Sequence, residues 1–164
     1  MTREERVGEV KSLARSFRNA FRGIAFCIQN ERNMRIHLTV GAYVLVFSPF
    51  FYLTAAEYAV LIVVITLVLV TETVNTAIEA AVNMQAQWYD SIARVAKDVA
   101  AGAVLLCALS AVVIGSILFL RPAVLLRIFF FLTDNLFCGA LFVISLPLAV
   151  LFIFRRPRFR RLHM

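Results

Sequence analysis

Apolar runs separated by short polar breaks dominate the chain from residue 36 onward. A membrane-spanning helix needs about 20 mostly apolar residues, and four of the runs are long enough. They predict spans at residues 36–54, 58–82, 97–120 and 136–154. Pro49 is expected to kink the first span or to end it early. The first two spans are joined by the very short segment TAAE, and residues 83–96 form a polar connection. Asp134 and Asn135 predict a turn before the fourth span.

Residues 2–29 have an amphipathic pattern instead. Apolar side chains recur at i, i+4, i+8 and i+11, namely at Leu13, Phe17, Phe21 and Ile24. Basic residues occupy the other faces. This spacing predicts a helix that lies along the membrane surface with its arginines toward the headgroups. A helix packed on the body of the protein would have the same pattern, so both interpretations stay open.

The composition supports an integral membrane protein, since 62% of residues are hydrophobic and only 16% are charged. The net charge of +7 does not favour nucleic acid as a partner, because the basic residues flank apolar runs and fit membrane topology better. The three cysteines are far apart, which favours neither a disulfide framework nor a thiolate metal site. The charged first thirty-five residues do not have the apolar core of a signal peptide.

The basic residues also predict the orientation. With four spans, every Lys and Arg except Arg121 and Arg127 falls on one side of the membrane. The positive-inside rule makes that side cytoplasmic. The polar end of the second span, residues 30–37 and the Lys97-Asp98 pair then meet at the face where ATP is present.

The segment TETVNTAIEAAVN, residues 71–83, ends the second span with unusual polarity. At about 100° per residue, one helix face carries its polar side chains, namely Glu72, Asn75, Thr76, Glu79 and Asn83. Such groups are costly in a membrane helix, which favours a functional site. Hydrogen bonds between the helices of an oligomer are the alternative.

Glu31, Glu72 and Glu79 are expected at one depth with Lys97 and Asp98. Carboxylate oxygens suit Mg²⁺, which usually also binds phosphates, and phosphoryl transfer needs a metal, a cation and a group to take the hydroxyl proton. The six glycines are too scattered for a nucleotide-binding loop, so helix side chains would have to bind the nucleotide.

Simpler roles exist for several of these residues. Glu31 has the helical spacing to pair with Arg35, and Lys97 with Asp98 suits the cap of the third span. His37 is interpreted as a structural hydrogen bonder and not as a ligand.

Four segments carry a family resemblance: SFRNAFRGI, NERNMRIH, ETVNTAIEAAVN and AKDVAAGAV. In this order and at these separations, over residues 12–120, the chain resembles the small bacterial diacylglycerol kinase and undecaprenol kinase family. The segment ERNMRIH is more similar to the undecaprenol kinase branch, because the other branch commonly has an acidic residue at the position of His37.

The resemblance implies a surface helix and three membrane helices per subunit, in a homotrimer with active sites at subunit contacts. It also implies transfer of the ATP γ-phosphate to a lipid primary alcohol with Mg²⁺, at the cytoplasmic side of the bacterial plasma membrane.

By position, the resemblance makes Glu72 the catalytic base, with Asn75 beside it. Glu31 and Glu79 would hold the metal that bridges to the nucleotide phosphates. The residues at the nucleotide would be Glu31, Glu79, Asn83, Tyr89, Asp90, Lys97 and Asp98.

Three features depart from the family pattern: Asn19 stands where an aromatic residue or histidine is common, Asn83 stands where an aspartate is usual, and the fourth span is extra. We therefore expect an all-α integral membrane fold with a lipid kinase domain at residues 1–120 and an extension at residues 121–164. The first hypothesis is an undecaprenol kinase and the second a diacylglycerol kinase. A non-catalytic oligomeric membrane protein that retains the fold is the alternative from another class.

Overall fold

The computed structural model describes residues 3–85 and 91–155. They divide into two units, residues 3–31 and residues 32–155, each of which is described by itself. All regular elements in these ranges are helices, and four of them are long and apolar enough to cross a membrane. The predicted all-α membrane fold is confirmed.

The N-terminal unit is one long helix, α1 (Arg3–Asn30), of 28 residues. It covers nearly the whole amphipathic segment, so the predicted helix is present. At its end the Asn30 amide donates to the Phe26 carbonyl at 2.9 Å. Its position along a membrane surface stays a prediction.

The first membrane span consists of α2 (Arg32–Phe47) and the 3₁₀ helix η1 (Ser48–Phe51). Pro49 lies in the first turn of η1, where its missing N–H is not needed, so the predicted early end is confirmed. Tyr52 then adopts a left-handed conformation with φ of 49°. The helix begins at Arg32 and not at residue 36, so most of NERNMRIH belongs to it.

The second span is α3 (Ala55–Gln85), and a capping box explains how so short a connection starts it. The Glu57 carboxylate accepts the Thr54 N–H at 2.7 Å, and the Thr54 hydroxyl accepts the Glu57 N–H at 3.3 Å. These two bonds satisfy backbone donors that a helix start leaves without partners.

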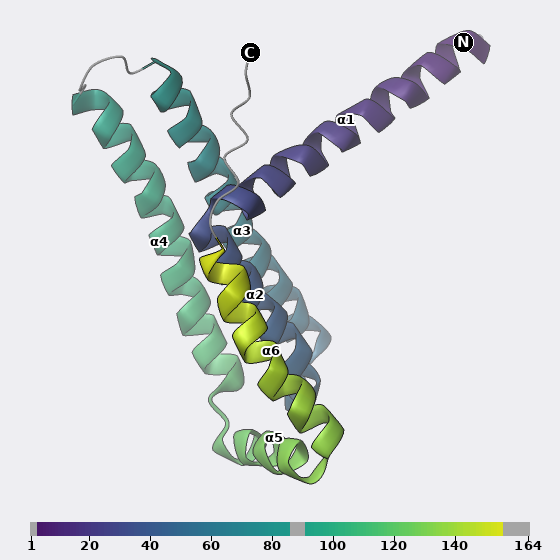
Figure 1. Ribbon diagram of the computed structural model, residues 1–164, viewed down its shortest axis with the longest axis vertical. Helices are drawn as coiled ribbons and strands as arrows, with labels where there is room; N and C mark the ends of the chain where they lie inside the picture. Colours follow the sequence, from purple (N-terminus) through teal and green to yellow (C-terminus); the bar gives the residue numbers. More distant parts are fainter. Residues whose placement is uncertain (1–2, 86–90, 156–164) are drawn as a thin grey trace. The chain divides into compact units, whose positions relative to one another are not determined.

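The third span is α4 (Ser91–Phe119), and its predicted start was wrong. Residues 83–85 still belong to α3 and residues 91–96 already belong to α4, so the connection is much shorter than predicted. Polar side chains in these turns suggested a loop, although helix turns that project beyond the lipid tolerate them. In Figure 1, α3 and α4 run side by side for most of their length.

The fourth predicted span is confirmed as α6 (Leu136–Phe154), but a helix before it was not predicted. That helix, α5 (Pro122–Asp134), has 13 residues, is about 20 Å long and is too short to cross a bilayer. It connects the end of α4 to the start of α6 (Figure 1).

The extension packs on α2, beside which α6 lies in Figure 1. Tyr43 and Ser145 share a hydrogen bond of 2.8 Å between their hydroxyl groups. The buried Arg35 guanidinium donates to the carbonyl oxygens of Phe152 at 3.3 Å and Arg155 at 2.6 Å. Because α6 ends at Phe154, these bonds satisfy carbonyls that a helix end leaves free.

The connection from α5 to α6 depends on Gly139. A Cβ built there would collide with the backbone carbonyl oxygen of Leu132, so only glycine lets the two helices approach this closely. By contrast, a Cβ at Gly115 in α4 meets nothing within 4 Å.

Replacing Gly139 by Ala should therefore destabilise the purified protein by about 1–3 kcal/mol, because the clash is with backbone and not with a flexible side chain. Thermal unfolding in detergent measures the change. Gly115→Ala is the matched control and should be neutral or stabilising by up to about 1 kcal/mol. Equal unfolding temperatures for the two variants would contradict the proposed close contact.

Candidate functional site

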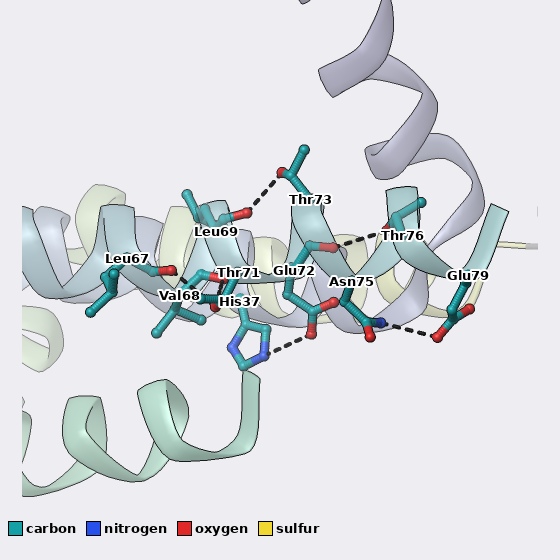
Figure 2. Close-up of polar contacts among 10 residues, drawn as sticks. All are labelled: His37, Leu67, Val68, Leu69, Thr71, Glu72, Thr73, Asn75, Thr76 and Glu79. Carbon is teal, nitrogen blue, oxygen red and sulfur yellow. Dashed lines mark hydrogen bonds and ion pairs between the residues drawn. The ribbon is translucent and has the colours of Figure 1, made fainter. Parts of the chain in front are cut away.

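The polar face of α3 exists as the sequence predicts. Figure 2 shows the side chains of Glu72, Asn75 and Glu79 extending from the same side of the helix. Glu72 is buried, and Asn75 and Glu79 are half-buried. Two turns separate the first carboxylate from the second, which puts both on one face.

Glu72 has the most unusual environment of the described site residues. Its side chain is 2% exposed, and Oε1 lies 3.4 Å from Nε2 of His37 on α2. This oxygen is buried and has no hydrogen-bond partner within the described residues. Because ionisable side chains within membrane helices are costly and rare, such a carboxyl group points to function.

Asn75 and Glu79 form a second pair one turn further along α3. The Asn75 amide nitrogen donates to Oε1 of Glu79 at 3.0 Å, which fixes the direction of that carboxylate (Figure 2). The amide oxygen of Asn75 is buried, and the described residues offer it no hydrogen-bond partner. An uncompensated buried oxygen is a reason to expect a ligand group beside it.

Thr76 shares the predicted face, but its hydroxyl is already satisfied. It donates to the Glu72 carbonyl at 3.0 Å, as the Thr73 hydroxyl does to the Leu69 carbonyl at 2.8 Å. Bonds of this kind to the preceding turn let threonine sit inside a membrane helix. Thr76 is therefore a structural member of the polar face.

Lys97 and Asn83 meet where α4 begins and α3 ends. The Lys97 ammonium donates to the Asn83 amide oxygen at 2.6 Å, so the amide holds the lysine without neutralising its charge. Lys97 lies in the second turn of α4, beyond the reach of a cap. Asp98 instead forms an exposed ion pair with Arg94 at 3.8 Å on the same helix, a pair worth little in water.

Three other predicted site residues are not placed relative to this arrangement. Glu31 belongs to the N-terminal unit and Glu79 to the other unit, and Tyr89 and Asp90 lie outside the described residues. Within the described ranges, no group of three or more His, Cys, Asp or Glu side chains could hold a metal alone. Glu79 nevertheless fits Mg²⁺, which commonly takes one or two carboxylates and completes its shell with phosphates and water.

Two apolar grooves border α2. One, of about 520 Å³, runs between α2, α3 and α4, and His37 lines it together with small and branched side chains such as Gly41, Val68 and Gly115. The other, of about 570 Å³, lies between α2 and the extension and is lined by none of the predicted site residues. His37 therefore lines the first groove and also lies beside the carboxyl group of Glu72.

His37 is the residue whose place in the site the sequence analysis missed. It was interpreted as a structural hydrogen bonder, and its Nε2 lies 3.4 Å from the buried carboxyl group of Glu72. The available signal was its position inside the first span, where an ionisable side chain is itself a reason to expect function.

Comparison with known proteins agrees with the motifs. The sequence model of the family described as prokaryotic diacylglycerol kinase matches residues 18–119. A protein of Synechocystis sp. named diacylglycerol kinase is 40% identical over 114 residues, which is 69% of this chain and 65% of that protein. A protein of Bacillus subtilis named undecaprenol kinase is 32% identical over 120 residues, or 73% of this chain and 98% of that protein.

The match thus spans slightly less than two thirds of the Synechocystis protein and nearly all of the Bacillus protein. One of these relatives is named for diacylglycerol and the other for undecaprenol, so the branch of the family to which this chain belongs stays a prediction. The predicted relationship itself is confirmed, and the chain belongs to the prokaryotic diacylglycerol kinase family, a family of membrane lipid kinases.

Proposed function

We propose that this protein transfers the γ-phosphate of ATP to the primary hydroxyl of undecaprenol at the cytoplasmic face of the bacterial plasma membrane. Family membership supports the kinase chemistry, and the identity of the lipid rests on the ERNMRIH segment. The single observation that carries the proposal is the Glu72 carboxyl group, whose buried Oε1 has no hydrogen-bond partner in the described residues.

In this proposal Glu72 is the base that accepts the lipid hydroxyl proton while the lipid oxygen attacks the γ-phosphorus. A base must come within hydrogen-bond reach of the proton that it takes. An oxygen without a hydrogen bond can accept a proton without first breaking an existing bond. The groove beside His37 supports the approach of a lipid chain to this position.

Glu79 and Glu31 would hold Mg²⁺ in the proposed site. Bound Mg²⁺ would neutralise charge on the nucleotide phosphates. Asn75 would keep the Glu79 carboxylate oriented through its bond of 3.0 Å. Orienting hydrogen bonds to metal-binding carboxylates commonly matter for affinity.

Lys97 and Asp98 would contact the nucleotide, with Tyr89 and Asp90 near it. The bond from Lys97 to Asn83 supports this role, because a neutral amide fixes the lysine and leaves its positive charge available for phosphate. An aspartate at position 83 would compete with phosphate for the same charge. The departure from the family pattern is therefore compatible with activity.

We further propose a homotrimer with a lipid kinase domain at residues 1–120 and an extension at residues 121–164. The family match ends at residue 119, which supports this boundary. Four candidate spans support a multi-pass membrane protein, and the basic residues favour a cytoplasmic site.

Diacylglycerol is the second candidate substrate, because the Synechocystis relative that carries that name is 40% identical to this chain. It would use the same base and the same nucleotide site. A groove lined by aliphatic side chains accepts acyl and isoprenoid chains alike, so the head of the lipid must decide the preference.

The Glu72→Gln variant should lower kcat by about 10²–10⁴-fold, because an amide cannot accept the hydroxyl proton. Transfer of labelled phosphate from ATP to lipid by the purified variant measures this. Asp134→Asn makes the same change at an exposed carboxylate at the end of α5 and should leave turnover unchanged. Normal turnover of Glu72→Gln would exclude Glu72 as the base, and wild-type protein inactive on every lipid alcohol would support the non-catalytic alternative.

A side-by-side assay of undecaprenol and diacylglycerol in the same detergent should give the higher kcat/KM for undecaprenol. Saturating ATP and Mg²⁺ keep the nucleotide step constant, so the ratio reports lipid preference alone. A higher kcat/KM for diacylglycerol would establish the second candidate instead.

Replacing Lys97 by Met should lower kcat/KM for ATP by about ten- to a hundredfold, the usual worth of a hydrogen bond to a charged group. The KM for lipid should change little. Arg127→Met removes the same charge on α5 and serves as the control. If both variants bind ATP like the wild type, Lys97 does not contact the nucleotide.

A further inference from the structure

A histidine and a buried carboxyl group face each other across two membrane helices. His37 on α2 approaches Glu72 on α3 with 3.4 Å between Nε2 and Oε1 (Figure 2). Both residues belong to the same unit of the structure. This oxygen of Glu72 is the one that has no hydrogen-bond partner among the described residues, so the imidazole is its polar neighbour.

The side chains of His37 and Glu72 differ strongly in their exposed fraction. Glu72 is 2% exposed, whereas His37 is 25% exposed. His37 is the sixth residue of α2, about 7.5 Å along the helix axis from Arg32. Arg32 and Asn33 are exposed at that helix start, so the imidazole lies close to the polar end of the span.

The proposed reaction creates a need for this contact. Once Glu72 has taken the lipid proton it is a neutral carboxylic acid, and it cannot act as a base again until the proton leaves. Its burial separates it from bulk water. Histidine is the side chain best suited to accept and release a proton near neutral pH.

We propose that His37 is the proton relay that returns Glu72 to its ionised form after each turnover. This inference rests on the function proposed above, in which Glu72 is the base. It assigns to His37 a role in the recovery of the enzyme, separate from binding lipid or nucleotide.

The O–H bond of the lipid breaks and its proton goes to Glu72, while the lipid oxygen bonds to the γ-phosphorus. The bond from that phosphorus to the bridging oxygen breaks, and ADP leaves. The proton then moves from Oε1 of Glu72 to Nε2 of His37, which becomes an imidazolium and releases a proton to water.

A rapid-quench experiment on the full-length protein in detergent, preloaded with lipid and mixed with ATP and Mg²⁺, tests the relay. The His37→Ala and His37→Gln variants should form the first lipid phosphate per site at the wild-type rate. Later turnovers should be at least about tenfold slower, because each must wait for the proton to leave Glu72. The result is a burst followed by a slow steady state, with the KM for ATP and for lipid unchanged.

Added imidazole supplies the second measurement. It should restore the steady-state rate of His37→Ala, and more basic substituted imidazoles should restore it better, as expected for proton transfer. Tyr43→Phe is the control: it removes from α2, the helix of His37, a hydroxyl that bonds Ser145 of α6, and it should have no burst and a normal rate.

Two outcomes would overturn the relay. One is a wild-type steady state in His37→Gln, which keeps a polar side chain but cannot carry the proton. The other is a first turnover slowed as much as the later ones, which a merely structural role would produce. The Glu72→Gln variant separates the hypotheses, because an inactive Glu72→Gln beside a normal His37→Gln overturns the relay alone.

Discussion

The burial of the Glu72 carboxyl group is the constraint on which the site depends. Inside a membrane helix this group loses water, and one of its oxygens gains no hydrogen bond from the described protein. The neighbouring helix, α2, brings the imidazole of His37 to 3.4 Å from that oxygen. That approach requires α2 and α3 to keep one relative position along their axes.

That relative position is set at the opposite ends of the two helices. The span of α2 closes with η1, and the capping box of Thr54 and Glu57 starts α3 directly afterwards. Arg121 at the end of α4 ties this turn to the third span through the Phe51 carbonyl at 3.2 Å and Glu57 at 3.4 Å. A buried apolar cluster there, Phe51, Leu53, Leu61 and Leu118, packs the same ends together. These contacts at one end of α2, α3 and α4 thus align α2 with α3 at the other end, where His37 and Glu72 lie.

The sequence predicted the spans because apolar runs of sufficient length have few alternatives in a chain of this composition. It failed where polarity and helicity coincide, as at Arg94, which lies on a helix although its segment was predicted as a connection. It also missed α5, because Asp134 and Asn135 marked a turn but gave no sign that a short helix precedes it. On one helix, periodicity placed Glu72, Asn75 and Glu79 together. The contact between His37 and Glu72 could not be predicted, since it depends on the register of two helices.

The bond between Arg35 and the end of α6 has a consequence for biogenesis. The carbonyls that accept from this buried guanidinium lie 117 and 120 residues later in the chain. Because the N-terminal part of a protein is synthesised first, α2 enters the membrane before these acceptors exist. The helix that carries Arg35 and His37 therefore reaches these hydrogen bonds only after α6 has been made.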